Sequence, residues 1–263
     1  MGAIVFVTAF SPVGDVCALL GPLSTRGSLT LKTKHLIVGE QMSYPAEIVI
    51  LSGEGPHTDP WHSLHETSAR MAEILGETNS VAIVKSIDEI EAALGGADVL
   101  LVNTSAYRST PIPEDDVFAH VLEGFLARGG NLLATHSATV AFPGLQSWRS
   151  VLGATWALGR TFHPPLGRSL IQKSEVVHPI TEGLGDFWVH DERYSNLDFV
   201  DERDIVPLYV HSEDGVTHPL VWAHTVENSR VVYNALGHDV SSFDSPEHVA
   251  LLKRTVSWLR HRA

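Results

Sequence analysis

The sequence predicts an α/β protein built on a doubly wound, mostly parallel sheet. From residue 42 onward, short apolar runs alternate with amphipathic segments in the order βαβαβαβ, the pattern of parallel strands joined by crossover helices. The runs are continuously apolar, as expected for strands that are buried on both faces. A chain of 263 residues is long enough for one such domain with a large core.

The first half supplies four strands and three helices. The strands are expected at 46–52, 81–85, 98–103 and 131–135, where they should lie side by side and parallel, with helices at 64–75, 87–94 and 113–128 on both faces of the sheet. The third helix has the clearest ends. Pro113 and three acidic residues open its first turn, and Gly129 closes it.

The second half is less regular, but no domain boundary follows residue 42. We expect a helix at 145–152, closed by Gly153, and a terminal helix at 246–261 with an apolar face. The remaining segments are four strands, at 169–173, 205–211, 220–224 and 230–235, and a helical turn at 179–184. Residues 42–263 are therefore predicted to form a single domain.

Residues 1–41 are predicted to be a disordered N-terminal extension, with Met42 as the natural start. The apolar segment 2–20 is interrupted by Asp15 and has no basic region before it, so it is a poor membrane helix and a poor secretory signal. The alternative is a genuine targeting segment. N-terminal sequencing of the native protein distinguishes the two, because a mature chain that begins before residue 30 contradicts the prediction.

Composition narrows the possible partners. A net charge of −13 argues against nucleic acid and anionic membranes as partners and favours neutral small molecules or cations; the alternative, taken as the default, is a charge that serves solubility. The single cysteine, Cys17, allows no intrachain disulfide, which fits a cytoplasmic location, and it leaves the domain without a cysteine nucleophile. The chain has neither a glycine-rich dinucleotide motif after a strand nor a phosphate loop, so we expect no nucleotide cofactor.

The two residues that follow the strand at 131–135 are candidates for a functional site. His136 and Ser137 follow it directly, and the active crevice of an open α/β sheet lies beyond the carboxyl ends of its strands. The corner lacks the flanking glycines of a nucleophile elbow. The alternative is a polar residue that caps the next helix.

Histidines and carboxylates recur at the ends of the predicted strands. His57, His136, His224 and His238 each close or follow one, and a second set comprises His163, Asp191, Glu192 and Tyr194. Such groups can hold a base, an acid and an orienting partner in one place, or they can ligate a divalent metal. The alternative for each histidine is a hydrogen-bonded structural role.

Several short segments resemble the ThuA-like family, named for trehalose utilisation. In chain order they are 51–53 with His57 and Trp61; 135–138 with Phe142 and Trp148; 152–154; 162–164; 177–181; Asp191, Glu192 and Tyr194; 218–222; and Gly237 with His238. They span residues 46–260. One departure is the segment 228–230, where the family usually has a glycine-rich turn.

The resemblance implies a flavodoxin-like sheet, similar to the class I glutamine amidotransferases, and a role in carbohydrate metabolism through 3-keto-sugar intermediates. The amidotransferase relatives use an elbow cysteine, which this domain lacks, so we expect no glutaminase activity. The leading catalytic candidate is His136, and the others are Asp191, Glu192, His57 and His238. The substrate-binding candidates are Trp61, His163, Tyr194, Trp222 and His218. The candidates for a metal are His136, His163, His238, Asp191 and Glu192.

Three functions remain open at this point. The first is an enzyme that acts on a disaccharide or a 3-keto-sugar by histidine and carboxylate acid–base chemistry. The second is a metal-dependent hydrolase on a sugar-like substrate. The third is a non-catalytic sugar-binding subunit. In each case the partner is a small sugar, with a homo-oligomer as a further possibility.

Overall fold

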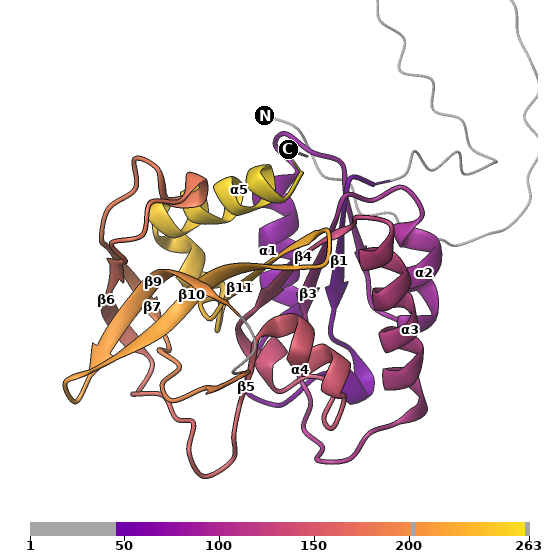
Figure 1. Cartoon of the computed structure of the whole chain (residues 1–263), viewed down its shortest axis with the longest axis horizontal. Helices are drawn as coiled ribbons and strands as arrows, with labels where there is room; N and C mark the ends of the chain where they lie inside the picture. The colour runs from indigo at the N-terminus through magenta and orange to yellow at the C-terminus, as the bar shows by residue number, and fades with distance from the viewer. Residues whose placement is uncertain (1–45, 201–203, 261–263) are drawn as a thin grey trace, which may run out of the picture. The chain divides into compact units, whose positions relative to one another are not determined.

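One nine-stranded sheet runs through the part of the chain that the computed structural model describes, residues 46–200 and 204–260. Its strand order is β2-β1-β3-β4-β11-β10-β9-β6-β7 (Figure 1). The predicted extension at 1–41 lies outside the described residues. No helix among the described residues is both long enough and apolar enough to span a bilayer.

The parallel half of the sheet confirms the predicted fold class. Its strands are β1 (Ile48–Ser52), β2 (Val81–Val84), β3 (Val99–Asn103) and β4 (Asn131–Thr135). β1 pairs in parallel with both β2 and β3, and β3 pairs in parallel with β4. Every residue of β1, β3 and β4 is buried, because helices cover both faces of these strands, as their continuous apolar sequences predict.

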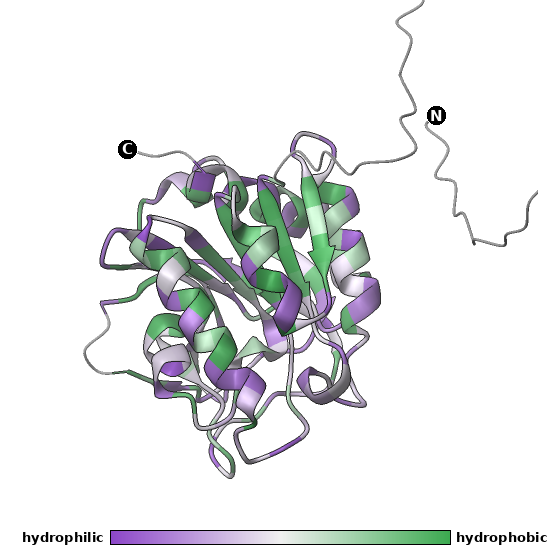
Figure 2. Cartoon of the chain, turned by 90° about the vertical axis from the view of Figure 1, so that its right-hand side faces the viewer, coloured by the Kyte–Doolittle hydropathy of each residue, from purple (hydrophilic) through white to green (hydrophobic). Residues whose placement is uncertain are grey.

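Helices pack on the sheet in two pairs. α2 (Ile87–Leu94) contacts α3 (Pro113–Ala127), and α1 (Leu64–Leu75) contacts α5 (Pro246–Arg260). Green, apolar helix faces turn toward the strands in Figure 2. The chain leaves β1 toward β2 in one direction and leaves β3 toward β4 in the other. This reversal opens a crevice at the carboxyl ends of β1 and β3.

The second half extends the sheet with one more parallel strand and four antiparallel ones. β11 (Ser229–Asn234) lies parallel to β4, and β10 (Val216–Val226), β9 (Val206–Glu213), β6 (Gly167–Lys173) and β7 (Phe187–Asp191) follow it with alternating direction. The carboxyl end of β7 therefore lies at the same edge as those of β4 and β11. A small second sheet joins β5 (Ala154–Thr155) to β8 (Asp198–Phe199).

Several elements differ from the expected ones, among them the short strands β5 and β8, which were not predicted. β7 was not predicted, because its sequence is neither a long apolar run nor a strict apolar/polar alternation: the apolar Trp188 is exposed and the polar Asp191 is buried. The helical turn expected at 179–184 is the shorter η3 (Pro179–Thr181). The helix expected at 145–152 is α4 (Gln146–Leu152), and Gly153 closes it with a φ of 86°, a value that favours glycine.

A buried histidine on β9 makes the stability of the fold sensitive to acid. Burial lowers the pKa of His211 to about 4, and the charges of His218 and Arg193 act in the same direction, against a hydrogen bond with the Tyr194 carbonyl. The unfolded chain binds this proton near pH 6.5 and the folded chain does not. The contribution of His211 is therefore complete above pH 6.5 and is lost as the pH falls toward 4.

We expect the protonation of His211 in the unfolded chain to lower the free energy of unfolding by about 2 kcal/mol as the pH falls from 7 to 5. A His211→Gln variant should lose correspondingly less stability over that interval in urea unfolding. His120→Gln, at an exposed position on α3, is the matched control and should follow the wild-type curve. Parallel curves for wild type and His211→Gln would contradict the assignment.

Candidate functional site

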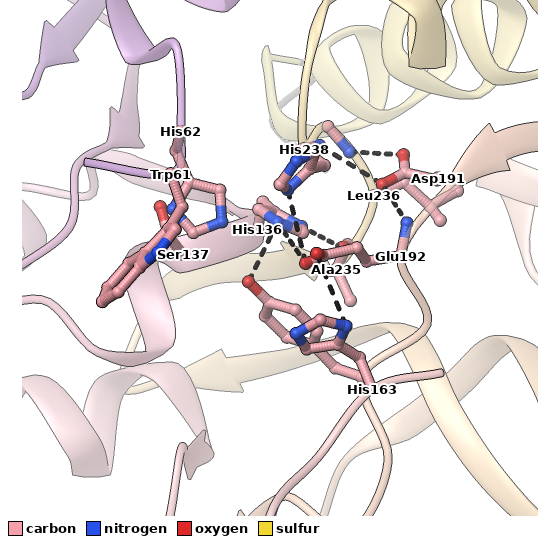
Figure 3. Close-up of polar contacts among 12 residues, drawn as sticks. Trp61, His62, His136, Ser137, His163, Asp191, Glu192, Ala235, Leu236 and His238 are labelled. Carbon is pink, nitrogen blue, oxygen red and sulfur yellow. Dashed lines mark hydrogen bonds and ion pairs between the residues drawn. The ribbon is translucent and has the colours of Figure 1, made fainter. Parts of the chain in front are cut away.

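Four side chains from distant segments converge at the carboxyl edge of the sheet. His62 follows β1, His136 follows β4, Glu192 follows β7 and His238 follows β11 (Figure 3). One side-chain nitrogen or oxygen from each lies within 4.8 Å of those of the other three. We call these four residues the His–Glu cluster. His136 and Glu192 are buried, whereas His62 and His238 are partly exposed, so the cluster lies at the solvent boundary.

His136 begins the 3₁₀ turn η2 (His136–Thr139) in a left-handed conformation, with a φ of 42°. Non-glycine residues adopt this conformation at a cost, and such residues are concentrated at functional sites. The Nδ1–H of His136 donates to the carbonyl of Ala235 at 2.7 Å, which leaves Nε2 unprotonated in the neutral ring. Nε2 is therefore the acceptor nitrogen, and it faces the cluster.

Tyr194 contacts the same nitrogen. Its hydroxyl lies 2.9 Å from His136 Nε2, and the two rings are 4.5 Å apart. Burial raises the pKa of Tyr194 well above its ordinary value, and the charges of Glu192 and Asp191 add to this effect. Tyr194 is therefore a protonated phenol that donates to His136.

His62 is oriented by a carboxylate. Its Nδ1–H donates to Asp59 at 2.6 Å, so Nε2 is the nitrogen left for the cluster. Asp59 also accepts from the Ser105 hydroxyl and from the backbone N–H of Trp61 and His62. Burial raises the pKa of Asp59, but the hydrogen bonds from His62 and Ser105 outweigh it and lower the value to about 2.

The surroundings of the cluster shift the pKa values of His62 and His238 in opposite directions. Burial lowers the pKa of His62, and the neighbouring His136 and His238 lower it further, against the pull of Asp59. The Glu192 carboxylate, in contrast, raises the pKa of His238, although burial opposes it. His62 is thus held neutral, while His238 retains a proton more readily.

Glu192 is the common neighbour of the histidines. Its Oε2 lies 3.5 Å from His136 Nε2 and 3.3 Å from His238 Nδ1, and its Oε1 lies 3.4 Å from His163 Nδ1. Burial raises the pKa of Glu192, but His136 and His238 outweigh it and hold the value well below the ordinary one. Glu192 is therefore an anion at neutral pH.

Asp191 does not face the cluster, which corrects its assignment as a catalytic or metal-binding candidate. Its carboxylate is fully buried and accepts from the backbone N–H groups of Glu192, Gly237 and His238 and from the Ser242 hydroxyl. Successive side chains of a strand point to opposite sides, so Asp191 and Glu192 cannot both face the site. Asp191 instead ties the His238 loop to the end of β7.

Three other predicted residues also lie outside the cluster. The ring of His57, in η1 (Gly55–His57), packs on Phe142 at 5.3 Å and lies 4.0 Å from Asp115. Trp222 is fully buried in the core, where its indole N–H donates to the Leu152 carbonyl, so it offers no surface to a substrate. The Nδ1 of His218 accepts from the backbone of Asn196 and supports the loop after β7. His224, another strand-end histidine, bonds to the Val151 carbonyl.

Two aromatic side chains stand exposed beside the cluster. Trp61, next to His62 in the chain, has 63% of its surface exposed and meets Tyr107, 70% exposed, edge to face at 5.0 Å. Large exposed aromatic side chains near polar groups are suited to stack on the apolar face of a sugar. On another side His163 lies in a solvent-accessible position against Glu192.

Sequence reasoning missed His62 and Asp59. It assigned the histidine after β1 as His57, although the same loop contains both His57 and His62. An available signal was the spacing of Asp59 and His62 directly before α1, which allows an aspartate to accept from the backbone and from the imidazole at once.

Comparison with known proteins identifies relatives of the whole domain. A family model described as ThuA, trehalose utilisation, matches residues 48–259. A ThuA-like protein from Parabacteroides merdae is 16% identical with a TM-score of 0.69, over 82% of this chain and 90% of that one. One from Bacteroides uniformis is 17% identical with a TM-score of 0.63, over 84% and 95%.

A third solved structure has a different description. It is a cytoplasmic protein from Salmonella typhimurium, 15% identical with a TM-score of 0.56, over 81% of this chain and all of that one (100%). No curated protein matches the chain. At these identities the structural likeness shows a common fold.

Proposed function

Because the chain belongs to the ThuA family, whose model covers residues 48–259, we propose that it is an enzyme of carbohydrate metabolism that acts on a disaccharide or a 3-keto-sugar derivative. The family's description, trehalose utilisation, supports the substrate class. The proposal includes a cytoplasmic location, which the description of the Salmonella relative supports.

The observation that carries the proposal is the His–Glu cluster itself. A keto group makes the hydrogen on the adjacent carbon removable by a base, and a leaving oxygen one carbon further on then needs an acid. Nε2 of His136 can accept a proton, while His238, whose pKa is raised, can supply one. Neighbouring groups whose environments push their pKa values apart are typical of an acid–base pair.

The surroundings of the cluster fit a sugar. Trp61 and Tyr107 offer an exposed aromatic surface, and the buried anion Glu192 provides a hydrogen-bond acceptor for hydroxyl groups. Glutaminase activity is not part of the proposal, because the corner after β4 carries His136 and the domain has no cysteine.

The test is turnover by the purified protein. It is incubated with a 3-keto-disaccharide and, separately, with the unoxidised disaccharide, and the products are followed by NMR. We expect cleavage of the keto form and slower or no cleavage of the parent. Binding of both sugars without any turnover would support a sugar-binding subunit instead and would overturn the proposal.

A further inference from the structure

We infer that the His–Glu cluster binds one divalent transition-metal ion of the zinc type. The inference rests on the proposed function only in taking the cluster as the reaction centre. It assigns four ligands: His62 and His136 through Nε2, His238 through Nδ1 and Glu192 through Oε2.

The distances fit one shared ion. In a tetrahedral site with metal–ligand bonds of about 2.1 Å, neighbouring ligand atoms are about 3.4 Å apart. Glu192 Oε2 lies 3.5 Å from His136 Nε2 and 3.3 Å from His238 Nδ1. All four ligand atoms lie within 4.8 Å of one another, so small side-chain rotations complete the site.

In two of the histidines, the ring nitrogen that would not bind the ion makes the hydrogen bond that is typical of metal centres. A metal-bound imidazole almost always donates its other N–H to a carboxylate or a backbone carbonyl, which fixes the tautomer and aims the lone pair at the ion. His62 donates to Asp59, and His136 donates to the carbonyl of Ala235. The Ser105 hydroxyl donates to Asp59 and holds it in place, and Asp59 in turn fixes the orientation of His62.

The cluster also contains an unsatisfied buried atom. His238 Nδ1 is buried, yet it has no hydrogen bond of good geometry, although Glu192 lies close by. The rings of His62, His136 and His238 pack edge to face, with centroids 4.8–5.4 Å apart. Tyr194 already donates to His136 Nε2, but no partner of good geometry meets His238 Nδ1. A cation would bind both nitrogens and the carboxylate at once when the Tyr194 hydroxyl turns away from His136.

The donor set favours the zinc type of ion. Imidazole nitrogens suit zinc and its neighbours among the transition metals, while magnesium and calcium prefer oxygen ligands throughout. Asp191 cannot join the set, because four donors occupy its two oxygens. His163 faces the other oxygen of Glu192 and stays outside the set.

A bound ion changes which groups move protons. It would polarise a sugar carbonyl or a bound water in the way that catalytic zinc does. Because His136 and His238 would be occupied as ligands, proton transfer would pass to the groups beside the ion. Tyr194, 2.9 Å from His136 Nε2, and His163 are the nearest such groups.

The test measures metal binding directly. The full chain without a histidine tag is stripped with a chelator, dialysed against Zn²⁺ or against Mg²⁺, and analysed by mass spectrometry for bound metal. We expect about one Zn²⁺ per chain and no comparable binding of Mg²⁺. His62→Ala and Glu192→Gln should each abolish stoichiometric binding, and Asp59→Asn should weaken it by about 10- to 100-fold.

His163→Ala is the matched control, because this histidine also contacts Glu192 but is not a ligand. It should bind Zn²⁺ as the wild type does, and circular dichroism should show that all variants are folded. Absence of stoichiometric Zn²⁺ from the folded wild type, or equal binding by wild type and His62→Ala, would overturn the inference.

The two proposals fail separately. Turnover of a keto-disaccharide by a folded wild type that binds no stoichiometric Zn²⁺ would refute the metal site and leave the proposed function intact. Stoichiometric Zn²⁺ bound at the cluster, with no turnover of any keto-disaccharide, would refute the proposed function and leave the metal site intact.

Discussion

Replacing His136 by asparagine should lower kcat on a keto-disaccharide by about 10²-fold or more, the usual scale for a lost acid–base group, because the cluster loses the nitrogen that accepts the proton or, with an ion bound, holds the ion. The substitution removes Nε2, which is the nitrogen that faces Glu192 and accepts from Tyr194. Asparagine tolerates the left-handed backbone at this position, where φ is 42°, better than alanine does. The loss should therefore arise in the chemistry, and thermal unfolding should show an intact fold.

His57→Gln is the matched control for this experiment. His57 follows the same sheet edge after β1, but its ring packs on Phe142 and Asp115. We expect its kcat to stay within a few-fold of wild type (on the order of 1 kcal/mol or less in activation free energy). A folded His136→Asn variant with full activity, or an equal loss in both variants, would contradict the role of His136.

Asp191→Ala should lower the free energy of unfolding by about 3 kcal/mol or more, a loss at the upper end of single substitutions. The carboxylate is fully buried and accepts four hydrogen bonds. Alanine leaves the backbone N–H groups of Gly237 and His238 buried without acceptors. The measurement is urea unfolding of the variant and the wild type at neutral pH.

Ser242→Ala provides the graded control, because it removes one of the four donors and leaves the carboxylate and its backbone partners in place. The variant also removes the contact of the Ser242 hydroxyl with His248 Nδ1, which keeps the Ser242 carbonyl as its partner. Its cost should be about 1 kcal/mol, typical of one hydrogen bond. Asp191→Ala should also reduce turnover, since Asp191 fixes the loop that carries His238. A loss of stability below that of Ser242→Ala would show that Asp191 does not hold this loop.

The parallel half of the fold was predictable because local and tertiary signals agree there. The strands β1, β3 and β4 are apolar runs buried on both faces, β2 at the edge of the sheet is apolar but only partly buried, and the helices α1 and α2 have an apolar face. β7 carries no such signal, because its apolar and polar residues do not match its buried and exposed positions: Trp188 is exposed and Asp191 is buried. Its pairing with β6 is decided by tertiary contacts between segments that are separated in the chain.

The sequence predicts which edge of the sheet carries the site, but it does not predict which side chains at that edge form it. His136, Glu192 and His238 follow strand ends, and topology brings strand ends together. The choice between Asp191 and Glu192 depends on which one the end of β7 turns toward the cluster. The choice between His57 and His62 depends on the path of a loop, which no periodicity in the sequence reports.

The most direct test of the central claim, that the His–Glu cluster is the reaction centre, is a crystal structure of the wild type with a carbon-linked 3-keto-disaccharide analogue, which has no leaving group and cannot be cleaved. We expect a sugar ring against Trp61, with its carbonyl about 3 Å from a group of the cluster or from an ion bound there. A different cavity, of about 340 Å³, lies beside Phe142 and Trp148. Sugar bound in that cavity, with the cluster left empty, would contradict the account.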